Sequence, residues 1–263
     1  MPPLSRHLLP FVASVLFAFA PFPIARAADT PPQSAAEIAS ALSATRQDGS
    51  DYIRMRMEIG GKDTLQVQIK QRQSNAGTDV VYQILFPKER KGEAVLLRRN
   101  GGKTTGTAFT PPGTPRPIED LHGAVFGSDL AYADLVENFF AWDQQKIVGN
   151  EAVDGVPCQI LESRPGNSTS IYSSVKSWID TRRMVPMRVE KYTGGGQLVR
   201  RIDTTKVVSD AGHQIPANLS VKAAKSDAGG TQLDGSRIKH DVNYTDHDFT
   251  PDALKDIGMP KGD

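Results

Sequence analysis

The chain of 263 residues is 38% hydrophobic and 23% charged, which is typical of a globular protein and excludes a disordered or multi-span membrane chain. It carries 31 basic and 30 acidic side chains, and removing Arg6 and Arg26 with the predicted leader leaves 29 basic ones. So balanced a chain lacks the cationic field that a phosphate backbone requires, and we expect no nucleic acid partner.

Residues 1–27 have the pattern of a secretory signal peptide. Arg6 supplies the positive charge, residues 8–20 are mostly apolar, and Ala25-Arg26-Ala27 forms a small-x-small cleavage pattern. The apolar stretch is shorter than the about 20 residues that a membrane-spanning helix needs. We therefore expect export across the inner membrane and a mature chain of residues 28–263 that folds as one domain.

The mature chain begins with a predicted helix and continues as alternating strands. Ser34-x-x-Glu37 is a capping box that predicts a helix to about Thr45. In residues 53–59 every second side chain is apolar and the others are charged, which predicts a half-buried antiparallel strand, and residues 65–69 repeat the alternation after a Gly-Gly turn. The apolar positions of these two strands are Ile53, Met55, Met57, Ile59, Leu65, Val67 and Ile69.

Further strands are predicted along the rest of the chain, with turns about every ten residues. They are residues 80–86, 94–97, 145–148, 156–161, 171–179, 187–192, 198–202, 217–221 and 231–238. A proline-rich segment at residues 111–117 cannot donate to a ladder and marks a sheet edge. This pattern predicts one curved antiparallel sheet, a half-closed barrel with helical cover.

Two more helices are predicted after the first. Ser128 can cap a helix whose apolar residues Tyr132, Leu135, Val136 and Phe139 follow helical spacing. A short helix is also expected at the C-terminal end, capped by Thr250 and with Pro251 at its first position. The apolar stripe of the helix after Ser128 would cover the sheet.

Candidate catalytic and metal-binding groups are sparse. The histidines of the mature chain lie near no G-x-S-x-G pattern, and Cys158, the one cysteine, is expected to be a buried thiol without a disulfide partner. His240 and His247 flank an acidic segment, but on a strand they would lie on opposite faces, so a solvated strand end is favoured over a metal site. We expect no enzyme activity, no cofactor and no metal.

The methionines of the first strand have two interpretations. Met55 and Met57 share a face with two isoleucines, and flexible thioethers adapt to irregular alkyl ligands. From the residues alone, the stripe is either ordinary core or the lining of a ligand cavity.

Motifs spread over most of the mature chain resemble the LolA-like group of secreted proteins, in the branch of outer-membrane lipoprotein-sorting proteins. The residues that carry this resemblance are Gly127-Ser128-Asp129-Leu130, Tyr132, Asp134-Leu135, Asp154-Gly155-Val156-Pro157-Cys158, Leu161-Glu162, Tyr172, Val175, Trp178-Ile179-Asp180 and Pro186-Met187-Arg188.

The resemblance implies a fold and a binding site. The fold is a LolA/LolB-like half-open antiparallel β-barrel of about eleven strands, with helices covering the concave side and an apolar cavity that shelters acyl chains. It favours cavity lining for the methionine stripe. The expected lining residues are Ile53, Met55, Met57, Ile59, Leu65, Val67, Ile69, Tyr132, Leu135 and Phe139.

The resemblance also implies a function. We expect a soluble carrier of lipids or acylated lipoproteins in the periplasm of a Gram-negative bacterium, with transient contact to membrane surfaces. Its expected partner is an inner-membrane transporter of the resistance-nodulation-division type. The alternative is a periplasmic sensor that binds a membrane protein's segment and responds to lipid or lipoprotein, and the sequence does not separate the two.

Overall fold

The computed structural model describes residues 33–47, 49–74, 77–166, 169–226 and 229–258. The predicted signal peptide lies outside these residues. None of the helices within them combines the length and the hydrophobicity that crossing a bilayer requires.

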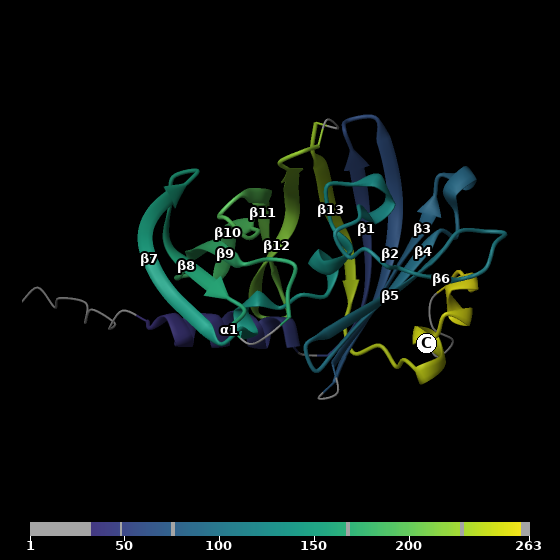
Figure 1. The fold of residues 1–263 in the computed structure, drawn as a ribbon, viewed down its shortest axis with the longest axis horizontal. Coiled ribbons are helices and arrows are strands. Elements are labelled where there is room, and N and C mark those ends of the chain that lie inside the picture. Colours follow the sequence, from purple (N-terminus) through teal and green to yellow (C-terminus); the bar gives the residue numbers. More distant parts are fainter. Residues whose placement is uncertain (1–32, 48, 75–76, 167–168, 227–228, 259–263) are drawn as a thin grey trace, which may run out of the picture. The chain divides into compact units, whose positions relative to one another are not determined.

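Thirteen strands of the described chain form one antiparallel sheet (Figure 1). They are β1 (Ser50–Ile59), β2 (Asp63–Ser74), β3 (Gly77–Phe86), β4 (Ala94–Asn100), β5 (Lys103–Phe109), β6 (Arg116–Pro117), β7 (Gln144–Val153), β8 (Val156–Arg164), β9 (Ser174–Asp180), β10 (Val185–Tyr192), β11 (Leu198–Asp210), β12 (His213–Ala223) and β13 (Thr231–Lys239).

The strand order is β6-β5-β4-β3-β2-β1-β13-β12-β11-β10-β9-β8-β7, so two meanders meet where β1 pairs with β13. The edge strands β6 and β7 do not pair with each other, and the sheet stays open. The predicted half-open antiparallel barrel is confirmed. It has two strands more than expected because residues 103–109 and 116–117 also join the ladder.

The alternating pattern of the first two strands sets their register. Met57 lies opposite Leu65, and Met55 lies opposite Val67. Because alternate side chains of a strand point to opposite faces, these apolar pairs share the inner face of the sheet, while Arg56 on the other face is exposed. Met57, Leu65 and Val67 are at most 1% exposed and form the centre of the core on this half of the sheet.

The inner face is covered by residues 118–143, and here the predicted α-helix is wrong. The segment contains only three short 3₁₀ turns, η2 (Val125–Gly127), η3 (Tyr132–Leu135) and η4 (Phe139–Ala141). Of the apolar residues of the predicted helix, Val136 and Phe139 are buried and Tyr132 and Leu135 are partly buried, and Val136 belongs to the core cluster with β1–β4. The helix does not form because Asp129 and Asp134 bond to distant strands and hold the backbone in another path.

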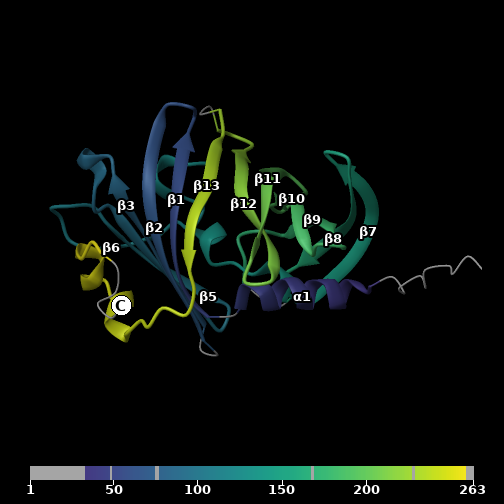
Figure 2. The same cartoon turned by 180° about the vertical axis from the view of Figure 1, so that it is seen from behind.

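The helix α1 (Ala35–Gln47) covers the ends of the strands on the β7 side (Figure 2). The predicted capping box is present, since the Ser34 amide donates to Glu37 Oε2 at 2.7 Å and the Glu37 amide donates to Ser34 Oγ at 3.2 Å. Leu42 packs with Phe139 and Phe140, so this helix and η4 share one core cluster with β8–β10.

The C-terminal segment packs on the other face of β3–β5. It contains two single 3₁₀ turns, η5 (Asp246–Phe249) and η6 (Asp252–Lys255), the second lying where a short helix is predicted. Phe249 and Leu254 are at most 1% exposed and pack against Val81 and Leu96. The strand β4 is therefore buried on both faces. A last turn, η1 (Lys88–Arg90), links β3 to β4.

Candidate functional site

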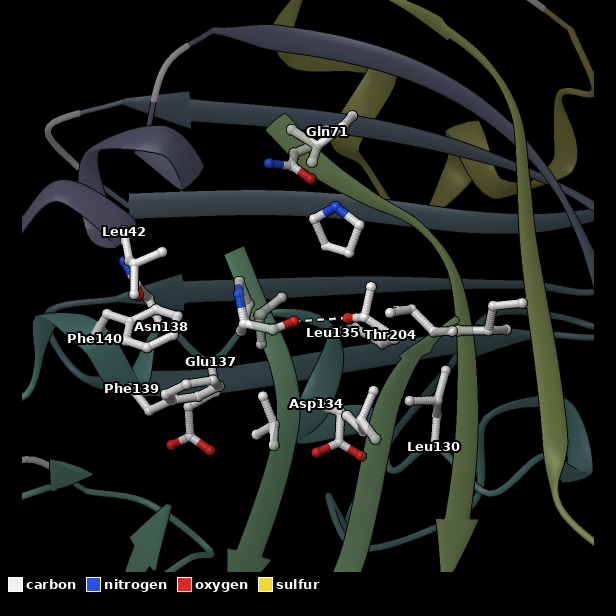
Figure 3. Close-up of a pocket in the computed structure, with 18 of the residues that line it drawn as sticks. Leu42, Gln71, Leu130, Asp134, Leu135, Glu137, Asn138, Phe139, Phe140 and Thr204 are labelled. Atoms are coloured by element: carbon white, nitrogen blue, oxygen red, sulfur yellow. Dashed lines mark hydrogen bonds between the residues drawn. The ribbon is translucent and has the colours of Figure 1, made fainter. Parts of the chain in front are cut away.

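A cavity of about 420 Å³ lies between the inner face of the sheet and the segment at residues 130–140. Figure 3 shows Leu42, Phe139 and Phe140 on one side of it and Leu130 on the other. Its lining consists of Leu42, Asp51, Met55, Gln71, Gln73, Thr78, Tyr82, Leu130, Asp134, Leu135, Val136, Glu137, Asn138, Phe139, Phe140, Met184, Pro186, Val189, Lys191, Ile202, Thr204, Gln214, Ile215, Pro216, Leu219 and Leu233. The volume falls within the range of small-molecule sites, and most of the wall is apolar.

The end of the cavity that contains Gln71, which we call the mouth, is bordered by polar side chains (Figure 3). Gln71, Gln73 and Thr78 come from the adjoining ends of β2 and β3, and Gln214 comes from the hairpin of β11 and β12. Strand β12 pairs with β13 only from Asn218 to Val221. Its first half has no ladder partner from β13 among the described residues, and Gln214, Ile215 and Pro216 in this half line the cavity.

His240 links the tip of this hairpin to the start of β1 through two hydrogen-bond contacts. His240 Nδ1 lies 2.8 Å from an oxygen of Asp51, and its Nε2 lies 2.8 Å from an oxygen of Asp210. Both contacts favour the protonated imidazole, and they raise the pKa of His240 above its ordinary value. Because Asp51 also lines the cavity, this bridge fixes one side of the mouth.

The inner end of the cavity, which we call the floor, contains a buried ion cluster around Asp134. Oδ1 of Asp134 accepts hydrogen bonds from Tyr172 Oη and Lys191 Nζ, both at 2.6 Å. Its Oδ2 accepts from the backbone amide of Ala131 at 2.7 Å and lies 2.9 Å from Arg200 Nη1. The carboxylate is thus fully bonded.

The ion cluster sets the protonation of its central carboxylate. Burial alone would raise the pKa of Asp134, but the charges of Lys191 and Arg200 outweigh burial and hold that pKa below its ordinary value. We therefore treat Asp134 as ionised. Its role is to fix residues 118–143, which we call the inner segment, to β10 and β11.

The two cations of the floor are bonded within the protein. The Lys191 ammonium lies 4.9 Å from the ring centre of Tyr172 and 5.4 Å from that of Phe139, in addition to its bond with Asp134. Arg200 donates from Nη1 to Tyr172 Oη and from Nε to the carbonyl of Asp129.

A second buried carboxylate ties the inner segment to the middle of the sheet. Asp129 Oδ2 accepts from Thr231 Oγ1 at 2.7 Å, and its Oδ1 accepts from the amide of Ala223 at 3.0 Å. Together, Asp129 and Asp134 hold residues 128–135 against strands β10–β13.

Glu137 lies at the floor as well, whereas Asn138 lies beside Leu42 (Figure 3). Oε1 of Glu137 lies 3.8 Å from Arg99 Nη1, and burial raises the pKa of this carboxyl group. The Asn138 amide nitrogen donates to Ser43 Oγ at 3.0 Å. Figure 3 shows the carboxyl groups of Asp134 and Glu137 directed to the same end of the cavity, away from Gln71.

The structure distributes the ten residues expected to line a cavity over three places. Met55, Leu135 and Phe139 line the cavity. Tyr132 borders a separate, smaller hollow that also includes Arg90. The other six belong to the core or pack against it, and they are Ile53, Met57, Ile59, Leu65, Val67 and Ile69.

Sequence reasoning missed most of the polar floor and part of the wall. Tyr172, just before β9, and Lys191 and Arg200, on β10 and β11, are far from Asp134 in sequence. Of these three, only Lys191 gives a signal, as a charge at a buried position of an alternating strand. Leu42 lies within the helix that the capping box predicts, but no pattern in the sequence indicates that it lines a cavity.

Comparisons with known proteins find one matching family model and solved structures that have a similar fold. A family model described as "Uncharacterized protein" matches residues 76–256. The fold is similar to a DUF1329 family protein from Desulfovibrio piger, with a TM-score of 0.74 and 20% identity over 84% of this chain and 97% of that one. A putative outer membrane lipoprotein-sorting protein domain from Vibrio parahaemolyticus gives a TM-score of 0.74 at 20% identity, over 84% and 98%.

A third similar structure is a LolA superfamily protein from Nitrosomonas europaea, with a TM-score of 0.67 and 20% identity over 84% of this chain and all of that one. At such identities these likenesses show the fold, which is that of the LolA superfamily and its lipoprotein-sorting domains. Among curated proteins, none matches this chain.

Proposed function

This chain belongs to the family described as "Uncharacterized protein" whose model spans residues 76–256, and we propose that it is a periplasmic carrier that shelters acyl chains. The observation that carries the proposal is the cavity of about 420 Å³ between an open sheet and an apolar inner segment. The solved lipoprotein-sorting domain of similar fold supports it by analogy.

The cavity wall suits an alkyl chain. Flexible Met55 and Met184 line the cavity together with aromatic Phe139 and Phe140, and thioether side chains adapt to a chain of variable shape. Each methylene moved from water into this wall contributes about 0.8 kcal/mol to binding. A chain of about fifteen methylenes therefore contributes about 12 kcal/mol, and after an association cost of about 4 kcal/mol this leaves a micromolar affinity.

Carriage of this kind needs no nucleophile. The thiol of Cys158 on β8 is buried in a cluster with side chains of β7, β9 and β10, and burial raises its pKa, which favours the protonated, less nucleophilic form. The buried acids of the floor are engaged in holding the inner segment.

The cellular location that we propose follows from the predicted signal peptide and from the acyl ligand. Cleavage after residue 27 would release the carrier into the periplasm of a Gram-negative bacterium. There it would receive a lipid or acylated lipoprotein from an inner-membrane transporter, for which we propose the resistance-nodulation-division type. Transient contact with a membrane surface would allow transfer of the cargo.

Binding of diphenylhexatriene tests the cavity, because this probe has no polar atom and fluoresces in an apolar site. In the variant Leu135→Trp the larger side chain would occupy the cavity, and we expect binding about tenfold weaker or worse. The control is Leu198→Trp, which makes the same substitution at a residue that is 39% exposed and lies outside the lining. Equal binding by both variants, with both folded by circular dichroism, would contradict the proposal.

Transfer between vesicles distinguishes the carrier from a sensor. The carrier should accelerate movement of a pyrene-labelled lipid from donor to acceptor vesicles, in proportion to its concentration. Uptake of the lipid without transfer, together with lipid-dependent release of a membrane protein segment, would replace the carrier with the sensor.

A further inference from the structure

We propose that the alkyl chain of the cargo enters and leaves the cavity sideways, through a gap in the sheet between the first half of β12 and the second half of β13. The bridge from His240 to Asp210 closes this gap and breaks during loading and release. This inference rests on the proposed function and adds to it the route of the cargo and the contact that controls the route.

Strands β12 and β13 pair over only part of their length. Their ladder ends where Asn218 lies opposite Asp234. Beyond that point β12 continues to pair with β11 as far as His213, and β13 continues to pair with β1 as far as Lys239. Figure 2 shows the two strands side by side at one end and apart at the other. Among the described residues, no ladder pair joins β12 to β13 along this stretch, which we call the gap.

A bulge in β13 marks the start of the gap. Between Gly235 and Arg237, β13 has one residue more than the opposite part of β1. A bulge of this kind bends a strand and increases its twist. Gly235 also lies where β13 runs close to β12, since a Cβ atom at this position would be 2.9 Å from the carbonyl oxygen of Ala217. The two strands are thus in close contact up to the bulge and diverge after it.

The cavity reaches the gap. Three consecutive residues of β12, Gln214, Ile215 and Pro216, line the cavity. Successive side chains of a strand point to opposite faces, so a cavity on the inner face alone would be lined by every second residue. Lining by consecutive residues means that the cavity extends around the edge of β12 that faces the gap. Gln214 is exposed and the other two are half-buried, so this edge is open to solvent.

His240 spans the gap. It directly follows β13, and its Nδ1 lies 2.8 Å from an oxygen of Asp51, on β1 at the β13 side of the gap. Its Nε2 lies 2.8 Å from an oxygen of Asp210, at the end of β11 on the other side. The side chain of His240 is 40% exposed, and exposed contacts between charged groups are weak, so they break and form again readily. The bridge can therefore close the gap reversibly.

A gap in the side of the sheet suits an alkyl chain that carries a polar head group. A chain that enters end-on must be threaded from its tip, whereas a chain that slides through the gap leaves its head group outside in water. The head group then keeps its hydration, which avoids the cost of burying polar groups. The chain itself is exposed to a membrane or an acceptor only while the bridge is broken.

The rates of uptake and release test the gap as a gate. A pyrene-labelled fatty acid is mixed with the protein in a stopped-flow instrument, and its release is measured into an excess of vesicles. In His240→Ala both rates should rise about tenfold while the dissociation constant stays within about twofold, because a gate changes the barrier and not the bound state. The matched control is His247→Ala, which removes an exposed histidine 3.8 Å from Asp256 and outside the lining, and it should leave both rates unchanged.

Covalent closure tests the same gap in the opposite direction. Asp210→Cys and His240→Cys, made together and joined by a short bismaleimide, should slow uptake and release about tenfold or more relative to the same variant capped with N-ethylmaleimide. The matched control joins His247→Cys to Asp256→Cys in the same way and should exchange the probe at the rate of its capped form. Cys158 is buried and is present in every sample, so its effect cancels.

The outcomes separate this inference from the carrier proposal. If His240→Ala and the wild type exchange the probe at the same rates, or if cross-linking does not slow exchange, the side route is wrong and the carrier stands. A weaker affinity with an unchanged rate of uptake would show that the bridge only supports the bound state, and it too would contradict the gate. If the wild type binds neither the pyrene-labelled fatty acid nor diphenylhexatriene, the carrier proposal fails and this inference fails with it.

Discussion

Replacing Asp134 with asparagine removes the charge at the centre of the floor and keeps the shape of the side chain. The carboxylate lies within 3 Å of donors from Lys191, Arg200 and Tyr172, and it is 1% exposed. In Asp134→Asn, two buried cations lose their shared counter-ion. Removing one partner of a buried ion pair costs about 3–5 kcal/mol, so we expect a loss of that size in the free energy of unfolding.

Urea unfolding followed by tryptophan fluorescence measures this loss, because Trp142 and Trp178 are both buried. For a chain of this size, about 3–5 kcal/mol corresponds to a melting temperature lower by roughly 6–20 °C. Adding Lys191→Met removes one of the unpaired cations, and the double variant should be less destabilised than the sum of its single variants by about 1–3 kcal/mol.

The pH dependence provides a further test of the same cluster. Because the folded pKa of Asp134 is lowered, its contribution is complete above the ordinary carboxyl pKa of about 4 and is lost as the pH falls through the lower, folded value. The free energy of unfolding of the wild type should therefore approach that of Asp134→Asn only below about pH 4. A loss under about 1 kcal/mol at neutral pH, or additive losses in the double variant, would refute the reasoning.

Two other variants test the mouth and the core. His240→Gln should lower the melting temperature at about pH 6. The difference in melting temperature from the wild type should shrink as the pH rises through the raised folded pKa of His240, because the imidazole then loses the charge that pairs with Asp51 and Asp210. Melting curves at several pH values measure this difference, and a difference that does not change with pH would contradict the prediction. Met57→Ala should lower the free energy of unfolding by about 2–5 kcal/mol, because Met57 is fully buried in the core. The folded variant should still bind diphenylhexatriene with the affinity of the wild type. Weaker binding would contradict the assignment of Met57 to the core and place it at the cavity.

The sheet could be predicted from the sequence because its signal is local. The alternation from Ile53 to Ile59 lies within one strand, and the structure places that strand at Ser50–Ile59. The capping box of Ser34 and Glu37 is equally local and is present. Periodicity of this kind indicates which face is buried, but it does not indicate what lies opposite that face.

The inner segment could not be predicted because its structure depends on distant partners. Tyr132, Leu135 and Phe139 have helical spacing, yet the first two lie on one 3₁₀ turn and Phe139 lies on the next. Asp134 contacts a lysine that is 57 residues away in sequence, and that bond outweighs the local preference for a helix. The position of this segment also decides which side chains line the cavity.

The position of the inner segment also explains why Met55 and Met57 lie in different surroundings. Met55 lines the cavity, whereas Met57 belongs to the core cluster that also contains Val125 and Val136 of the inner segment. The alternation of the strand gives both methionines the same face and does not indicate this difference.

The central claim is that the cavity holds an acyl or alkyl chain in the living cell. Native mass spectrometry of the protein, purified without detergent from the periplasm of its own host, tests this claim most directly. We predict a bound species that is removed by organic extraction, contains an acyl or alkyl chain, and is reduced in Leu135→Trp but not in Leu198→Trp. The mass of the bare polypeptide alone, together with no uptake of diphenylhexatriene, would contradict the account.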